Sequence, residues 1–254
     1  MEQINTNDNH ENLEKIKQKA FKEYQEIMEQ IYADGFSKYA EKLDNLNEAF
    51  EGCDNCVRCV DEGTPGGVHS AGSGILRDEN EVIESFKKAG VKKITSHDGC
   101  GAAAYYAKLN DLDSTKSDEY GKEWSQKIAT ALDIPYEHID ASDMNRSIEF
   151  HNARISYYDG TGKFDYSKVE GLPPGFIISR NIQSLDVSLE EVGISQQIAL
   201  GDHGFGELFS QDNPFLIVAI AESEEALAEL KEELSNLENL PKTVTIDGFV
   251  TPKN

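Results

Sequence analysis

Positive charge is scarce in this sequence. Among 254 residues, Lys and Arg number 24 against 47 Asp and Glu, which gives a formal net charge of −23 at pH 7. Such an excess of negative charge repels the phosphates of nucleic acids and the anionic head groups of lipids. We therefore expect neither a nucleic acid nor a membrane surface as a direct partner.

Long apolar segments are also missing. The longest uninterrupted apolar run, Phe215 to Ala221, has seven residues, whereas a helix that spans a membrane needs about 20. The first residues, Met1 to Glu14, are polar and acidic, which is unlike a secretory signal peptide. The sequence thus predicts a cytoplasmic protein without a membrane span.

Cysteine is infrequent, and three of the four cysteines are clustered. Cys53, Cys56 and Cys59 fall within seven residues, and Cys100 is the fourth. In a chain without an export signal, this clustering favours metal or redox chemistry in a reducing compartment over a disulfide framework.

The expected order of elements is that of an α/β protein. Apolar residues recur at three- and four-residue steps from Glu11 to about Phe50, with a break at residues 33–35, which predicts an N-terminal helical arm. One helix pair cannot bury its own apolar stripe, so the arm should pack on the body or on a second subunit. Strands are then expected at 56–60, 91–96 and 136–141, and helices at 78–89, 101–109 and 116–132. The first of these helices should have Asp78 as its N-cap and Gly90 just after its end. This alternation predicts a mostly parallel sheet flanked by helices.

The rest of the chain continues with α/β elements. Residues 154–164 resemble a hairpin or an edge strand that turns at Asp159-Gly-Thr-Gly162. Further strands are expected at 176–180, 215–221 and 242–250, and a Glu-rich helix at 223–237. The dense polar segment Asp202 to Glu207 is interpreted as a plain loop.

One group of residues has the pattern of a catalytic metal site. Cys59-Val-Asp61 follows a predicted strand, and His97-Asp-Gly-Cys100-Gly101 lies where the next strand gives way to a helix. In an open parallel sheet, functional groups collect at the carboxyl ends of the strands. Two thiolates and one imidazole suit a tetrahedral Zn²⁺ whose fourth position is left for water.

These motifs resemble those of the β-class carbonic anhydrases, which carry Cys-x-Asp-x-Arg, then an Ala-Gly-Asn turn, then His-x-x-Cys-Gly. Here the corresponding residues are Cys59-Val-Asp61-Glu-Gly63, Ser70-Ala71-Gly72-Ser73 and His97-Asp-Gly-Cys100-Gly101. The resemblance implies that Cys59, His97 and Cys100 bind Zn²⁺. It also implies that a hydroxide on the metal, oriented by Asp61, attacks CO₂ to give bicarbonate.

The resemblance further implies a fold and a domain organisation. We expect a β-carbonic-anhydrase-like α/β fold with an N-terminal helical arm (1–50), a zinc-binding core (51–165) and a C-terminal α/β extension packed on the core (166–254). Members of the family use the arm to embrace a partner, so a homodimer or a higher even oligomer is expected.

The chain departs from the family at the arginine that keeps the aspartate off the metal. Gly63 stands at that position, so Asp61 could close the site, or another cation could substitute. Arg77 and Arg180 are the candidates, whereas Arg58 adjoins Cys59 on a strand and should point to the opposite face.

Other interpretations of these residues remain open. The Cys53-x-x-Cys56-x-x-Cys59 spacing matches the start of an iron–sulfur run, with Cys100 as a distant fourth ligand, and a structural Zn(Cys)₄ site has the same basis. His69 is a possible proton carrier or a loop residue without a role. The alternative functions are hydrolysis of carbonyl sulfide or carbon disulfide, and a catalytically silent zinc-binding scaffold.

Overall fold

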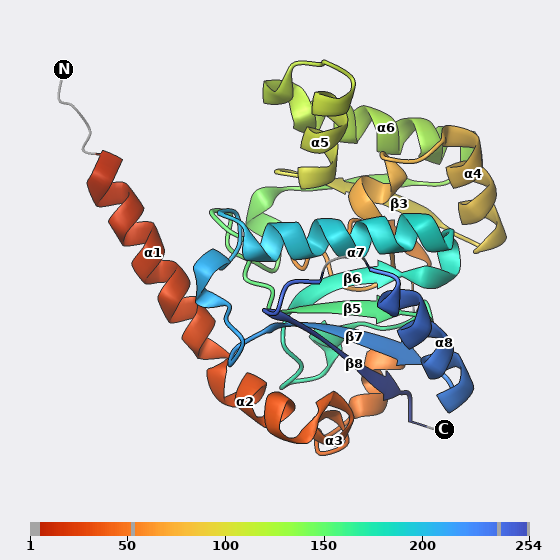
Figure 1. Ribbon diagram of the computed structural model, residues 1–254. Helices are drawn as coiled ribbons and strands as arrows, with labels where there is room; N and C mark the ends of the chain where they lie inside the picture. Colours follow the sequence, from red (N-terminus) through yellow and green to blue (C-terminus); the bar gives the residue numbers. More distant parts are fainter. Residues whose placement is uncertain (1–5, 52–53, 238–239, 253–254) are drawn as a thin grey trace.

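The computed structural model describes residues 6–51, 54–237 and 240–252. The chain forms two four-stranded parallel sheets flanked by helices (Figure 1). The strands of the first sheet are β1 (Cys56–Arg58), β2 (Val68–His69), β3 (Lys93–His97) and β4 (Tyr136–Ile139). The strands of the second are β5 (Ile155–Asp159), β6 (Gly175–Ser179), β7 (Phe215–Ala221) and β8 (Val244–Val250). The predicted α/β class with parallel sheets flanked by helices is therefore confirmed.

The α-helices are α1 (Thr6–Glu23), α2 (Gln25–Asp34), α3 (Phe36–Ala40), α4 (Glu79–Lys88), α5 (Gly101–Leu109), α6 (Ser117–Leu132), α7 (Leu185–Leu200) and α8 (Glu224–Ser235). Short 3₁₀ segments are η1 (Leu46–Phe50), η2 (Ala71–Gly74), η3 (Ser114–Lys116), η4 (Ala141–Asp143), η5 (Tyr166–Lys168), η6 (Arg180–Ile182) and η7 (Gly206–Leu208). No helix within the described residues is both long and apolar enough to cross a bilayer.

The first sheet has the strand order β2-β1-β3-β4, with every pair parallel. Helices α4 and α6 cover one face and bury Val82, Phe86 and Ile128 against it. Asp78 caps α4 by accepting from the backbone amides of two residues in its first turn, as the sequence predicts. Because β1 and β3 are neighbours, the segments that follow them lie at one edge.

The second sheet has the order β6-β5-β7-β8 and is buried on both faces. Helices α7 and α8 lie on the face that carries Tyr158, whereas α2 and α3 pack on the opposite face, which carries Tyr157. Burial of both faces explains the unbroken apolar sequence of β7.

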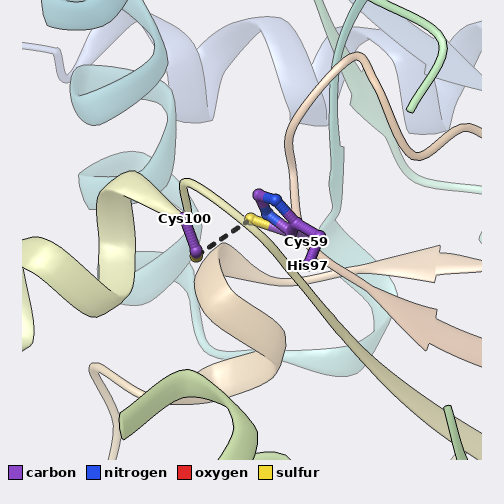
Figure 2. Close-up of side chains that lie close together, drawn as sticks. All are labelled: Cys59, His97 and Cys100. Carbon is purple, nitrogen blue, oxygen red and sulfur yellow. Dashed lines mark hydrogen bonds between the residues drawn. The ribbon is translucent and has the colours of Figure 1, made fainter. Parts of the chain in front are cut away.

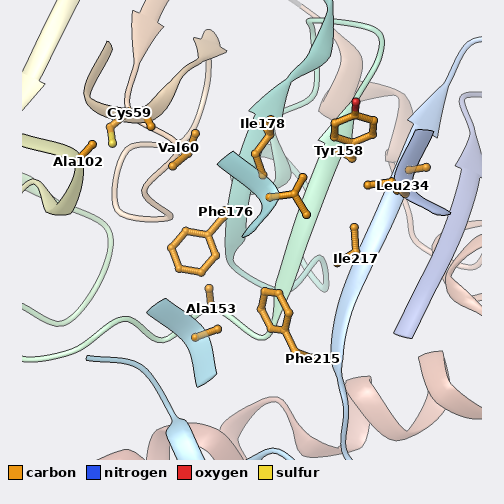
Figure 3. Close-up of a cluster of buried hydrophobic side chains, with 14 of the residues drawn as sticks. Cys59, Val60, Ala102, Ala153, Tyr158, Phe176, Ile178, Phe215, Ile217 and Leu234 are labelled. Atoms are coloured by element: carbon orange, nitrogen blue, oxygen red, sulfur yellow. The ribbon is translucent and has the colours of Figure 1, made fainter. Parts of the chain in front are cut away.

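The two sheets meet along β6. The Ile177 amide donates to the Val60 carbonyl at 3.1 Å, and the His69 amide donates to the Ser179 hydroxyl at 2.9 Å. Figure 3 shows Val60 beside the side chains of the second sheet in a shared apolar core. The edge that carries the candidate metal ligands is therefore covered by the second sheet and its helices.

The prediction of a hairpin or an edge strand at residues 154–164 is wrong. Strand β5 is central, with parallel neighbours β6 and β7 on either side. All five of its residues are buried, so alternation of apolar and polar positions, the sign of a half-exposed strand, is missing. The turn at Asp159 does form, because the Asp159 carboxylate accepts from the Thr161 amide, but no returning strand follows.

Helix α7 was not expected from the sequence. It contains Gly193 and buries the polar side chains of Ser188, Glu191 and Ser195, so it lacks an apolar stripe of helical period. Two of these polar groups bond partners far away in the sequence: Ser195 bonds the Ser156 hydroxyl of β5 at 2.7 Å, and Glu191 accepts from the Ala71 amide at 2.6 Å. Ser188 instead donates to the Ser184 carbonyl one turn earlier.

The sequence predicts that the N-terminal arm packs either on the body or on a second subunit, and the structure shows it packed on the body. Phe21 of α1 makes edge-on contacts with Phe205 and Phe209, and the first part of α1 projects away from the body (Figure 1). The helical pattern expected up to Phe50 ends at Ala40, because turns follow and Asn45 takes a left-handed conformation before η1. The three-part division of the chain stays a prediction.

Candidate metal centre

The structure brings Cys59, His97 and Cys100 together at the edge of the first sheet (Figure 2). Cys59 directly follows β1, His97 is the last residue of β3, and Cys100 is the N-cap residue of α5. The carboxyl ends of neighbouring parallel strands meet at one edge, which is why residues 38 or more positions apart converge here. All three side chains are buried.

The geometry of this group fits a tetrahedral metal ion. The Cys59 and Cys100 sulfur atoms are 3.9 Å apart, far longer than a disulfide. Two sulfurs bound at about 2.3 Å to a tetrahedral centre lie about 3.8 Å apart. One ligand atom from each of the three residues lies within 4.8 Å of the others. The group could therefore hold a metal ion.

The orientation of His97 supports the same interpretation. Its Nδ1 bonds the Asp98 carbonyl at 2.8 Å; a carbonyl only accepts, so Nδ1 carries the proton and Nε2 offers a lone pair in the neutral ring. Nε2 is buried and has no hydrogen-bond partner among the described residues. A buried nitrogen without a partner is costly unless it binds something. A metal-bound histidine typically donates its other ring nitrogen to a carbonyl or a carboxylate, as Nδ1 does here.

The electrostatics of the centre favour positive charge. Burial alone lowers the pKa of His97, but attraction to Cys59 and Asp61 outweighs burial and raises it to about 9. The pKa of Cys100 is lowered, chiefly by the hydrogen bond with Cys59 and further by the backbone amides of α5. The hydrogen bond with Cys100 and burial raise the pKa of Cys59 well above its ordinary value, so the two sulfurs together favour one negative charge, which a metal cation would balance.

The loop at Gly72 supports the cysteine sulfur. The Gly72 amide donates to the Cys59 sulfur at 3.2 Å. Gly72 has a φ of +53°, and a Cβ there would lie 2.6 Å from the Ile75 side chain. Both the positive φ and the close approach require glycine at this position.

Asp61 is held by an arginine that the sequence analysis missed. Its carboxylate accepts from Arg146 Nε at 2.7 Å and Nη2 at 2.9 Å, and from the Gly63 amide at 2.8 Å. Burial would raise the pKa of Asp61, but His97, His151 and Arg146 together hold it well below its ordinary value. Asp61 is therefore an anion whose two oxygens are fixed in place.

Gly63 provides the space that this arginine needs. A Cβ at position 63 would lie 2.7 Å from the Met144 methyl and 2.9 Å from Arg146 Cγ. The Asn145 amide also donates to the Gly63 carbonyl at 2.8 Å. The arginine that contacts Asp61 is thus supplied by the segment that joins the two sheets, and not by position 63.

The two arginines expected as substitutes lie elsewhere. Arg180 forms a fork with Glu233, at 2.9 Å and 3.0 Å, and Arg77 lines a separate groove with Glu81. Arg58 pairs with Asp54 at 3.1 Å, in keeping with its expected position on the other face. No local spacing links Arg146 to Asp61, since 85 residues separate them, so sequence reasoning had no signal for the pair.

A second buried pair, Glu62 and His151, lies beside Asp61. The Glu62 carboxylate is fully buried and accepts from the Asn152 amide at 2.8 Å, and His151 Nδ1 is 2.9 Å from its other oxygen. Asp61, Glu62 and His151 are close enough to form a metal-binding group. The Asp61 carboxylate, however, is already paired with the guanidinium of Arg146, whose positive charge disfavours a metal ion at this place.

The remaining residues singled out in the sequence do not join the centre. Cys56 is buried at the start of β1 and belongs to no metal-binding group of the described residues, and Cys53 lies outside the described residues. His69 is in β2 rather than in a loop; it is fully buried, its Nδ1 bonds the Cys59 carbonyl at 2.7 Å, and burial lowers its pKa to about 4.

A cavity of about 330 Å³ opens beside the centre. Its wall includes Cys100, the stem of Arg146, His151 and the exposed His203. Much of the remaining wall is apolar and includes Ala104, Met144, Ile148, Phe150 and Ile198, but Asp98, Ser117 and Glu149 also line the cavity. The cavity gives the buried metal-binding group a route to solvent that suits a small molecule.

No family model, no curated protein and no solved structure matches this chain. The fold and the site therefore define a class only: an α/β protein with two parallel sheets and a buried Cys-His-Cys group that could hold a metal ion.

Proposed function

We propose that this protein is a zinc-dependent enzyme that catalyses the reversible hydration of CO₂ to bicarbonate. The observation that carries the proposal is the clamp on Asp61: a buried carboxylate, held by Arg146 and the Gly63 amide, two residues after a metal-binding cysteine. The motif resemblance to the β-class carbonic anhydrases supports the proposal. The family has, at the position of Gly63, an arginine partner for the aspartate, and its absence there favoured a silent scaffold; Arg146 now provides that partner.

The roles of the chain's own residues follow from this arrangement. Cys59, His97 and Cys100 would hold Zn²⁺, which when bound activates water as a nucleophile near neutral pH. Asp61 accepts a hydrogen bond from the reacting water and so orients its lone pair toward CO₂. Arg146 keeps Asp61 ionised and, through two hydrogen bonds, keeps its carboxylate away from the position of the metal.

The partly apolar lining of the cavity is compatible with the proposed substrate. The apolar part of its wall, with Ile148, Phe150 and Ile198, favours a small uncharged molecule, and Arg146, which also lines the cavity, attracts the anionic product. Carbonyl sulfide and carbon disulfide are linear and uncharged, like CO₂. A hydrolase for these molecules is therefore the alternative outcome of the test below.

The test measures bound metal and reaction rate on one preparation. Protein purified under reducing conditions without chelator is assayed for zinc and for CO₂ hydration between pH 7 and 9. About one zinc per chain with fast hydration, lost in Cys59→Ser and His97→Ala, supports the proposal. Zinc with sulfide release from carbonyl sulfide but no hydration supports the alternative, and zinc with neither activity supports a scaffold.

The oligomeric state is tested separately. The resemblance supports a homodimer, and light scattering on the same preparation would report it. A monomer that hydrates CO₂ would refute the dimer and leave the reaction unaffected.

A further inference from the structure

The proposed reaction releases a proton in a buried place. Hydration of CO₂ by water yields bicarbonate and one proton in each turnover. The three metal-binding side chains are at most 5% exposed, so the proton must reach solvent through a group that lines the cavity. An imidazole suits this task because its pKa lies near neutrality.

His151 is the histidine placed for this transfer. It lines the cavity, and its Nδ1 lies 2.9 Å from Glu62 and 3.9 Å from an oxygen of Asp61. Because Nδ1 is bound to Glu62, Nε2 is the nitrogen left to exchange a proton with water in the cavity. The backbone amide of His151 donates to the His203 carbonyl at 2.7 Å, and its ring packs on Phe176 at 5.5 Å. The ring is therefore fixed between Asp61 and the opening.

The other histidines with described side chains are less suitable. His69 is fully buried behind the Cys59 carbonyl. Both ring nitrogens of His138 are bound, one by Ser96 and one by Asp98. His203 lies at the exposed rim, and no contact with Asp61 or Glu62 is recorded for its side chain among the described residues.

We infer that His151, paired with Glu62, carries the proton from the reacting water to solvent. The inference rests on the proposed function. In each turnover His151 Nε2 accepts the proton by way of cavity water and passes it to buffer, so the ring returns to its neutral form. The Glu62 carboxylate, 2.9 Å from Nδ1, accepts from that nitrogen, so Nε2 is the position at which the proton is exchanged.

The charges around His151 favour the protonated ring. Glu62 and Asp61 face it from the segment after β1, and the cation Arg146 faces it from the segment after β4. Burial lowers the pKa of His151, but Glu62 and then Asp61 outweigh both burial and Arg146, so the pKa is raised above its ordinary value. A carboxylate partner is thus a means of tuning proton affinity without contact with substrate.

The test separates proton transfer from CO₂ conversion. In zinc-loaded protein at low buffer concentration, His151→Ala should lower kcat about tenfold or more, with kcat/KM for CO₂ within about twofold of the original. Added imidazole should restore most of the lost kcat. His203→Ala is the comparison, a histidine of the same cavity wall without a carboxylate partner among the described residues, and should lower kcat less than His151→Ala does.

A second measurement does not depend on turnover. Titration of the His151 ring followed by NMR in the zinc-loaded protein should give a lower pKa in Glu62→Gln, by about one unit or more, because the variant removes the negative charge that favours imidazolium. Glu62→Gln should also shift the pH profile of kcat to lower pH.

Each outcome decides one question. Equal losses in kcat and kcat/KM without rescue by imidazole, an unchanged His151 pKa in Glu62→Gln, or a His203→Ala variant as impaired as His151→Ala would overturn the assignment to His151 while the hydratase stands. Absence of hydration in the unaltered zinc-loaded protein would overturn the proposed function and, with it, this inference.

Discussion

Replacing Arg146 by Met should cost the protein both stability and activity. Arg146 and Asp61 are 6% and 4% exposed at their side chains and are joined by two hydrogen bonds. Breaking a buried ion pair by removal of one partner costs about 3–5 kcal/mol, because the other charge is left uncompensated. The Gly63 amide and His151 still face Asp61, so we expect the lower end, about 3 kcal/mol.

This free energy sets the size of the measurable effect. For a chain of this length, each 1 kcal/mol shifts the midpoint of thermal unfolding by about 2–4 °C, so Arg146→Met should unfold about 6–12 °C earlier. The CO₂ hydration that we propose should fall in parallel, because Asp61 would then be free to move toward the position of the metal. Calorimetry and stopped-flow hydration on zinc-loaded protein measure the two effects.

Arg180→Met is the matched control. Arg180 forms the same kind of fork with Glu233, but the two side chains are 25% and 21% exposed. A partly exposed pair contributes about 1 kcal/mol or less, and Arg180 lies away from the metal-binding group. If Arg146→Met proved as stable and as active as Arg180→Met, the proposed role of the Asp61 clamp would be refuted.

A charge exchange extends the same test. Gly63→Arg alone should be destabilising, because its Cβ would approach Met144 and Arg146 to less than 3 Å. Gly63 has no positive φ, so the backbone accepts a larger residue once space is made. Combined with Arg146→Gly, Gly63→Arg would have room for a guanidinium beside Asp61, because the Arg146 side chain is then gone. We expect the double variant to be more active than either single variant.

Three further outcomes are expected. Cys59→Ser and His97→Ala should each lose most of the bound zinc, measured by metal analysis, and stabilisation by added zinc should disappear with it. Gly72→Ala should lower the free energy of unfolding by about 1–3 kcal/mol, measured in urea, because it strains a positive φ and overpacks Ile75. Burial raises the pKa of Glu191 to about 7, so folding favours its protonated form; that stability is full below the unfolded pKa, near 4.5, and is lost as pH rises toward 7. Glu191→Gln should flatten this part of the stability–pH curve, and an unchanged slope would contradict the assignment.

The sequence was most informative where local chemistry decides the structure. As predicted, Asp78 caps the start of α4 and Gly90 follows its end with a positive φ. Both features are decided by local chemistry. The convergence of Cys59 with His97 and Cys100 was also predictable, because it needs only two parallel neighbouring strands and the turns after them. These predictions use contacts whose geometry is set by a few adjacent residues.

The parts that failed depend on the second sheet. From its own sequence, β5 is predicted to be an edge strand, whereas in the structure β6 and β7 flank it on both sides. Helix α7 has polar residues where an apolar stripe is expected, and the reason lies in distant partners: Glu191 accepts from Ser70 and from the Ala71 amide. Packing between the two sheets decides these elements, and no local pattern encodes it.

The position of Arg146 shows why a missing motif residue is weak grounds for a lost function. What Asp61 needs is a guanidinium with two parallel donors at its carboxylate, and the long side chain of arginine can bring one from any backbone segment that passes nearby. The segment between the two sheets passes there, tied to Gly63 through the Asn145 amide. A side chain at position 63 would fill the space that Arg146 occupies. Glycine at 63 and arginine at 146 are therefore two parts of one arrangement, and changing either alone should disrupt it.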